Sequence, residues 1–131
     1  AGAGATRDDE PIEVSTRHDL ATALVATGFS YEAERRRAQA TALVDILPNV
    51  RDIRRLGGAA VDLCALACGR VDAYYERGLG RWDSAAGALI AAEAGAVIDD
   101  RSEVGGALVG ATPAIADDFF SLVDAAGGHE A

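Results

Sequence analysis

From Leu20 onward, short apolar segments alternate with longer segments of helical spacing, and no other feature of the sequence constrains the fold as strongly. Residues 24–28 are typical of a buried strand that ends in a glycine turn, and residues 31–47 have the spacing of a helix that stops at Pro48. Further strands are predicted at 51–56, 72–76, 96–98 and 107–109, and further helices at 58–68, 82–94 and 114–125. This alternation predicts an α/β fold, in which helices flank a layered sheet that is mostly parallel or mixed.

The start of the chain has a different pattern. Short segments at 3–6 and 12–15 flank a polar connection that contains Pro11, which predicts a β-hairpin. Because two strands alone are not stable, we expect this hairpin to complete the sheet of an upstream domain. The chain has no methionine, and we expect it to be the C-terminal portion of a longer protein. We therefore expect two parts, the hairpin over residues 1–18 and a C-terminal α/β substrate-binding domain over residues 19–131.

Composition excludes several classes of partner. The chain has 131 residues, the size of one ordinary domain, and a formal net charge of -9 with no lysine. Such a negative field repels phosphate backbones, so we expect no nucleic-acid partner. The apolar stretches are interrupted well before the ~20 residues that cross a bilayer, so we expect no membrane partner. Two cysteines are too few for a disulfide framework, and we expect a cytoplasmic protein.

Two carboxylates, Glu76 and Asp83, flank a loop that contains glycines. Glu76 ends a predicted strand and Asp83 begins a predicted helix, and in α/β sheets ligands collect outside the carboxyl ends of strands. The alternative for Asp83 is a helix N-cap, although one oxygen can cap while the other binds a hard cation such as Mg²⁺. The alternative for Glu76 is a solvated carboxylate that pairs with Arg77 or Arg81.

The run WDSAAGALI at residues 82–90, followed by EAGA at 93–96, resembles the C-terminal signature of the inositol monophosphatase family. The segments RRLGGAAVDLC at 54–64 and ATGFSY at 26–31 are similar to further parts of that family. The resemblance covers essentially the whole chain and is to the bacterial inositol-1-monophosphatase type. It implies the C-terminal half of an αβαβα sugar-phosphatase fold and a Mg²⁺-dependent, lithium-sensitive hydrolase.

The resemblance also implies roles for individual residues. Asp83 becomes a metal ligand, and Glu76 becomes the acceptor of hydrogen bonds from inositol hydroxyls. Four further residues are implied on the substrate side of the pocket: Arg54, Gly57, Gly58 and Ala59. The family's other metal ligands, a glutamate site and an Asp-Pro-Ile/Leu-Asp-Gly-Thr motif, do not occur in these 131 residues. We therefore expect the chain alone to be inactive, with a missing N-terminal half as the partner that carries those ligands.

These observations lead to one principal hypothesis and two alternatives. The principal hypothesis is the C-terminal portion of a Mg²⁺-dependent phosphomonoesterase that hydrolyses inositol 1-phosphate to inositol and phosphate, acting as a cytoplasmic homodimer. The first alternative is a sister phosphatase that acts on fructose 1,6-bisphosphate, histidinol phosphate or adenosine 3′,5′-bisphosphate. The second alternative, which the missing ligands favour, is a non-catalytic interaction protein.

Overall fold

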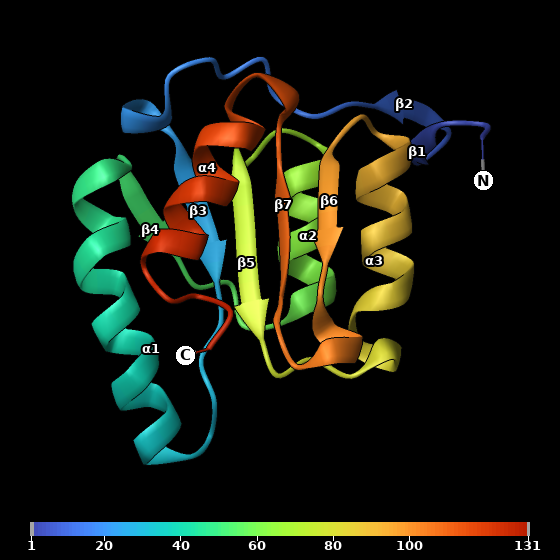
Figure 1. Ribbon diagram of the computed structural model, residues 1–131. Helices are drawn as coiled ribbons and strands as arrows, with labels where there is room; N and C mark the ends of the chain where they lie inside the picture. The colour runs from blue at the N-terminus through green and yellow to red at the C-terminus, as the bar shows by residue number, and fades with distance from the viewer. Residues whose placement is uncertain (1, 131) are drawn as a thin grey trace.

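The computed structural model describes residues 2–130 and contains one mixed sheet between two pairs of helices (Figure 1). The strands of this sheet are β3 (Leu24–Thr27), β4 (Asp52–Arg54), β5 (Ala73–Arg77), β6 (Val97–Asp100) and β7 (Ala107–Ala111). The α-helices are α1 (Ala33–Ile46), α2 (Ala59–Ala67), α3 (Arg81–Glu93) and α4 (Pro113–Ala125). The α/β fold predicted from the sequence is confirmed. Within residues 2–130, no helix has both the length and the apolar character that a membrane span requires.

The strand order is β4-β3-β5-β7-β6, so β5 lies at the centre of the sheet. Strand β3 runs parallel to β4 and β5, whereas β7 runs antiparallel to both β5 and β6. Parallel neighbours need a crossover connection, and α1 and α2 provide those connections between β3, β4 and β5. The carboxyl ends of β3, β4 and β5 therefore meet at the edge of the sheet where α2 and α3 begin (Figure 1).

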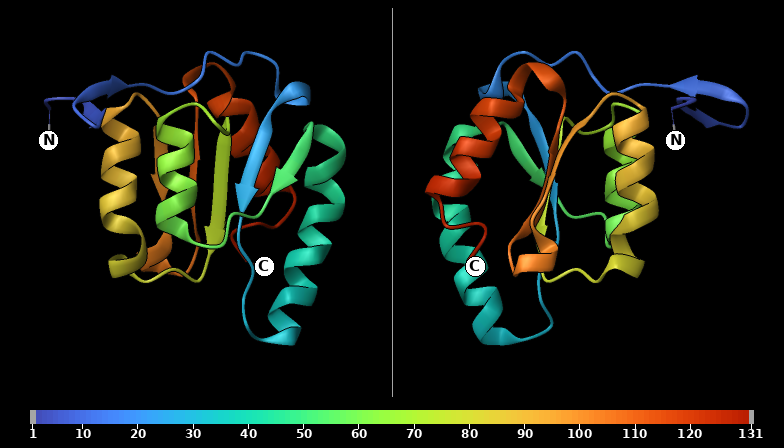
Figure 2. Two further views of the ribbon diagram at one scale, coloured as in Figure 1. Left: turned by 180° about the vertical axis from the view of Figure 1, so that it is seen from behind. Right: turned by 45° about the vertical axis from the view of Figure 1, so that its right-hand side comes forward.

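Two apolar cores lie on opposite faces of the sheet. Val25 and Tyr75 pack with side chains of α1 and α4, whereas Ala26 and Tyr74 pack with side chains of α2 and α3. Figure 2 shows the sheet between these two helix pairs. Successive side chains of a strand point to opposite faces, so Glu76, two residues after Tyr74, faces the α2 and α3 side.

The predicted hairpin is present, but its strands are shifted along the sequence. It consists of β1 (Ala5–Arg7) and β2 (Glu10–Ile12), which pair antiparallel. Asp8 and Asp9 form the turn with φ values of 51° and 66°, a left-handed geometry that Asp tolerates and that two-residue hairpin turns require. The prediction that Pro11 lies in the connection was wrong, because Pro11 lies in β2 opposite Thr6. A proline is accepted there because alternate residues of an antiparallel pair exchange no hydrogen bonds.

The buried side chain of Asp72 fixes the segment that follows the hairpin. Its Oδ1 accepts a hydrogen bond from the Ser15 hydroxyl at 2.6 Å, and its Oδ2 accepts one from the Leu24 backbone N–H at 2.8 Å. Arg17 Nε lies 3.5 Å from the same Oδ2. The Thr112 hydroxyl donates to the Ser15 carbonyl at 2.6 Å, and the Thr112 N–H donates to the Asp72 carbonyl at 3.0 Å. Asp72 therefore connects the N-terminal segment to three strands of the sheet.

We expect Asp72→Ala to destabilise the chain strongly. The substitution leaves the Leu24 N–H without its acceptor, and such a part-buried donor costs about 1–3 kcal/mol. It also removes the hydrogen bond from the Ser15 hydroxyl, which keeps only its 3.1 Å contact with Thr112 Oγ1. The free energy of unfolding, measured by urea denaturation, should fall by about 2–4 kcal/mol. Asp52→Ala, which removes an exposed carboxylate paired with Arg54, is the control and should have little effect. Equal losses in both variants would contradict the role given to Asp72.

Candidate active site

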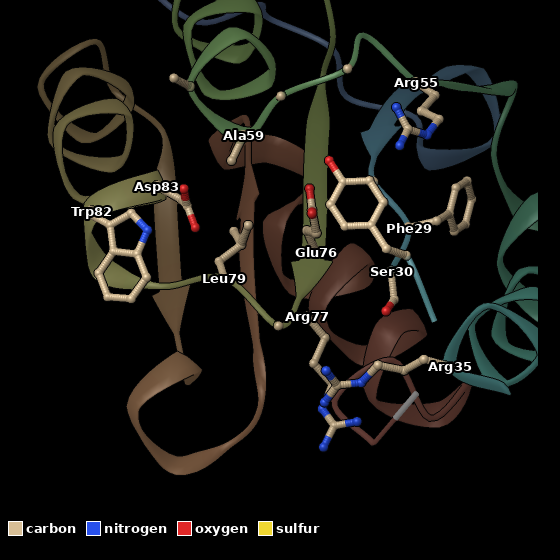
Figure 3. A pocket seen from close by; sticks show the side chains of 16 residues that line it. Phe29, Ser30, Arg35, Arg55, Ala59, Glu76, Arg77, Leu79, Trp82 and Asp83 are labelled. Carbon is tan, nitrogen blue, oxygen red and sulfur yellow. The ribbon is translucent and has the colours of Figure 1, made fainter. Parts of the chain in front are cut away.

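A cavity of about 550 Å³ opens at the carboxyl edge of the sheet, where the beginnings of α2 and α3 face the ends of β3 and β5 (Figure 3). In open α/β sheets this edge is the usual position of a ligand site. Four segments line the cavity, together with two arginines: residues 28–31, 57–60, 76–79 and 82–83, with Arg35 and Arg55. The two carboxylates selected from the sequence, Glu76 and Asp83, both lie in this cavity.

Asp83 is the third residue of α3, and its side chain is exposed. The alternative in which Asp83 is the N-cap is wrong, because α3 begins at Arg81 and Gly80 is the N-cap. Asp83 Oδ2 instead accepts a hydrogen bond from the Gly80 N–H at 3.2 Å, as the third residue does in a capping box. Its other carboxylate oxygen has no hydrogen-bond partner among residues 2–130. An exposed carboxylate with a free oxygen fits a hard cation such as Mg²⁺.

The described residues do not contain a complete metal site. No group of three or more His, Cys, Asp or Glu side chains within residues 2–130 is arranged to hold a metal ion. Mg²⁺ needs several oxygens in near-octahedral order. Asp83 therefore does not belong to such a group of three within residues 2–130.

Glu76 lies near the end of β5, is partly buried and accepts a hydrogen bond from Tyr74. The hydroxyl of the fully buried Tyr74 donates a hydrogen bond to Glu76 Oε1 at 2.8 Å. Burial raises the pKa of the Glu76 carboxyl, and the negative charge of Asp83 adds to that rise. The hydrogen bond from Tyr74 and the positive charge of Arg55 lower the pKa and offset part of the effect. The Tyr74 contact thus both orients the carboxylate and favours its charged form.

The Glu76 carboxylate occupies the space that a side chain at position 28 would need. A Cβ on Gly28 would lie 2.6 Å from Glu76 Cδ and 2.8 Å from Oε2, which are distances that real Cβ atoms do not show. The sequence identifies Gly28 as a turn glycine, whereas the structure gives it a second role. Because Gly28 has no side chain, the Glu76 carboxylate can occupy its position in the cavity.

The four residues that the family resemblance implies on the substrate side do not all lie in the cavity. Three of them line the cavity: Gly57, Gly58 and Ala59. Arg54 does not, because it lines a second groove and its Nη1 lies 2.7 Å from Asp52 Oδ2. Arg55 lines the cavity instead. Arg54 is the last residue of β4, and consecutive residues in extended chain point to opposite sides.

Asp62 is an acidic residue of the site region that the sequence analysis missed. It is 1% exposed, and neither carboxylate oxygen has a hydrogen-bond partner within residues 2–130. Burial and then the charge of Glu76 raise the pKa of Asp62 to about 6. Arg55 and the nearby Leu56 N–H lower it only in part, and the N–H does not complete a hydrogen bond. Helical spacing could have found it, because Asp62 lies on the apolar face of α2 beside Leu63.

The sequence model of the inositol monophosphatase family matches residues 1–120. The chain belongs to the inositol monophosphatase family. Among its relatives is an inositol-1-monophosphatase of Mycobacterium leprae, which is 51% identical over 126 residues. That match covers 89% of this chain and 43% of the relative. The protein named Nus factor SuhB of Xylella fastidiosa is 46% identical over 100 residues, covering 76% of this chain and 36% of the relative.

Solved structures of the family share the fold. Mycobacterium tuberculosis SuhB has 45% sequence identity and a TM-score of 0.84, and the match covers 91% of this chain and 48% of that protein. The inositol monophosphatase from Anabaena has 32% identity and a TM-score of 0.83, with coverage of 95% and 52%. The chain therefore spans about half the length, or less, of these family members. The family and the mixed-sheet fold predicted from the signature at residues 82–96 are confirmed.

We expect Tyr74→Phe to raise the pKa of Glu76 further, because the hydrogen bond that favours the charged carboxylate is lost. The measurement is a pH titration of the Glu76 side-chain carboxyl carbon by NMR. Tyr75→Phe is the matched control, since it removes a hydroxyl from the neighbouring buried tyrosine on the opposite face of the sheet. An unchanged Glu76 pKa in Tyr74→Phe would show that the 2.8 Å contact does not act on the carboxylate.

Proposed function

We propose that this chain is the C-terminal portion of a Mg²⁺-dependent phosphomonoesterase that hydrolyses inositol 1-phosphate to inositol and phosphate. The observation that carries the proposal is the meeting of Glu76 and Asp83 in one cavity at the carboxyl edge of the sheet. Membership of the inositol monophosphatase family over residues 1–120 supports it. The proposed cofactor is Mg²⁺, and the proposed substrate is a phosphorylated polyol.

Asp83 is proposed as a metal ligand. Asp83 would hold Mg²⁺ through its free oxygen, and the ion would supply Lewis acidity for hydrolysis of the phosphate ester. The chain's own contribution is to hold the carboxylate in place, with the Gly80 N–H on Oδ2 and the other oxygen open to the cavity. Because residues 2–130 contain no group of three such ligands, we propose that the chain alone is inactive.

Glu76 is proposed as the residue that recognises the alcohol part of the substrate. A carboxylate can accept hydrogen bonds from two hydroxyls, and such charge-assisted bonds are stronger than neutral ones. Tyr74 orients Glu76 through Oε1, which leaves Oε2 to a ring hydroxyl. The proposed substrate wall is the backbone of residues 57–59, where the two glycines let a ring approach the main chain closely. In this proposal Arg55 takes the substrate-side position that the resemblance implies for Arg54.

We propose that the missing metal ligands lie in the part of the full-length relatives that this chain does not span. The support is a second groove of about 760 Å³ between the hairpin, α2 and α3. Val61, which is 56% exposed, and Leu56, which is 45% exposed, line it together with Ile12 of the hairpin. We propose that an N-terminal half covers this groove and that residues 1–18 complete its sheet. We also propose that the complete protein is a homodimer and that it is located in the cytoplasm.

Two other functions remain as alternatives. A sister phosphatase shares the metal chemistry and differs in recognition of the alcohol, for which Glu76 favours a polyol. A non-catalytic interaction protein is favoured by the absence of further metal ligands in residues 2–130 and by the relative named Nus factor SuhB. If the complete protein hydrolyses inositol 1-phosphate and loses this activity when Asp83 is replaced, the second alternative is excluded.

We expect Asp83→Asn in the complete protein to lower turnover of inositol 1-phosphate by about two orders of magnitude or more. The amide keeps an oxygen for the Gly80 N–H, so the melting temperature should change little. The measurement compares Mg²⁺-dependent phosphate release with thermal unfolding. Asp117→Asn, on the exposed face of α4, is the control for loss of one charge. A variant that melts much earlier but keeps its specific activity would reduce Asp83 to a capping residue.

Glu76→Gln tests polyol recognition separately from the metal. No proposed ligand is removed, so the Mg²⁺ requirement should stay the same. The preference for inositol 1-phosphate over glycerol 2-phosphate, measured as a ratio of kcat/KM values, should fall by about 10- to 100-fold, as expected for a charge-assisted hydrogen bond of about 1.5–3 kcal/mol. Glu103→Gln, an exposed carboxylate outside the cavity, is the control. An equal loss on both substrates with a raised Mg²⁺ requirement would place Glu76 among the metal ligands instead.

A further inference from the structure

The main chain after α4 turns back toward the end of the sheet that carries the cavity. Residues 126–130, which we call the strap, begin where α4 ends and reach the end of β5 (Figure 1). The Gly128 N–H donates to the Val123 carbonyl at 2.9 Å, as in a Schellman motif. A Cβ at Gly128 would lie 2.5 Å from Val123 Cγ1, so a larger residue would not fit there. The strap is therefore packed closely against α4.

The imidazole of His129 connects the strap to the first residue of β7. The His129 side chain is 10% exposed, and its Nδ1 accepts a hydrogen bond from the Ala107 N–H at 3.0 Å. Because the accepting nitrogen carries no proton, the proton of the neutral ring is on Nε2, which lies 3.1 Å from Asp124 Oδ1. Gly106 leaves room for the ring, since a Cβ at that position would lie 3.1 Å from Nδ1. The ring thus lies between the start of β7 and α4.

The strap also contacts the last residue of β5. Arg77 Nη1 donates to the Glu130 carbonyl at 2.8 Å, and Arg77 Nε donates to the Gly105 carbonyl at 2.7 Å. Arg77 lies opposite Ala107 in the antiparallel pair of β5 and β7. The strap therefore contacts both residues of the final pair of this ladder, which the end of a helix does not require.

This final pair is next to the cavity. Glu76 precedes Arg77 in β5, and both residues line the cavity. Gly128 of the strap lines a smaller cavity together with Gly28, Glu76 and Arg77. The strap and the carboxylate proposed to bind the alcohol part of the substrate therefore border the same space.

We propose that the strap fixes the end of β5 for substrate binding and that His129 is its positioning residue. Tyr74 orients the Glu76 side chain through a hydrogen bond, whereas the strap holds the main chain that follows Glu76. Strand ends open locally when their last pair is not held, so release of the strap would loosen the position of Glu76. Asp83 belongs to α3 and would stay in place. This inference rests on the role proposed for Glu76.

Two variants of His129 in the complete protein test the strap. His129→Phe keeps an aromatic ring and removes the acceptor, whereas His129→Asn keeps an acceptor oxygen at the position of Nδ1. We expect the Ala107 amide to exchange with deuterium about tenfold faster in His129→Phe and at its original rate in His129→Asn. The NMR signal of the Glu76 side-chain carboxyl carbon should shift in His129→Phe and return toward its original position in His129→Asn.

His18→Phe makes the same replacement at the other histidine of the chain, which is exposed, and serves as the control. It should leave both the Ala107 exchange rate and the Glu76 signal unchanged. An unchanged exchange rate in His129→Phe, or a Glu76 signal that does not move, would overturn the proposal.

Kinetics of the complete protein give a separate result. The KM for inositol 1-phosphate should rise about three- to tenfold in His129→Phe, with kcat within about twofold, because Glu76 is proposed to bind the substrate and not the metal. A smaller fraction of folded protein would instead lower the measured kcat and leave KM unchanged, and that result would overturn the positioning role. A complete protein that does not hydrolyse inositol 1-phosphate would contradict the proposed function, whereas the Ala107 exchange and the Glu76 signal would still decide whether the strap positions the end of β5.

Discussion

Strand β5 is hydrogen-bonded along both edges, and the core and the cavity both depend on its register. It pairs with β3 so that Tyr74 lies opposite Ala26, and with β7 so that Glu76 lies opposite Leu108. A slip of one residue would exchange the two faces of the strand, moving Glu76 out of the cavity and Tyr75 into it. The side chain of Asp72, just before β5, accepts the Leu24 N–H and so holds this register where the strand begins.

The cavity combines negative charge at one side with positive charge at the other. Asp62, which interacts electrostatically with Glu76, has a carboxylate that is buried without a hydrogen-bond partner within residues 2–130. Its pKa of about 6 lies above the ordinary aspartate value of 3.8, so the folded chain binds this proton more tightly than the unfolded chain does. The stability that protonated Asp62 contributes is complete below about pH 4 and is lost as the pH rises through about 6. A buried carboxylate that lowers stability at neutral pH is typical of residues near a functional site.

Much of the fold and part of the site could be predicted from the sequence, because both depend on periodicity and on glycine and proline positions. The alternation after Leu20 identified each strand and helix of the main sheet, and Glu76 and Asp83 followed from their positions at element ends. The choice between Arg54 and Arg55 depends on the residue at which β4 stops, and strand ends are not encoded by hydropathy. The place of Pro11 depends on which alternate pairs of β1 and β2 exchange hydrogen bonds, which the sequence does not specify.

The close approach of Glu76 to Gly28 has an evolutionary consequence. The two positions lie on neighbouring parallel strand ends but 48 residues apart in sequence, and they share one volume. Any side chain at position 28 must displace the carboxylate, and a shorter residue at 76 would leave that volume empty. Substitutions at these two positions are therefore epistatic, with the effect of each dependent on the other. Replacement of Gly28 by a larger residue would thus require the side chain at position 76 to move or to change with it.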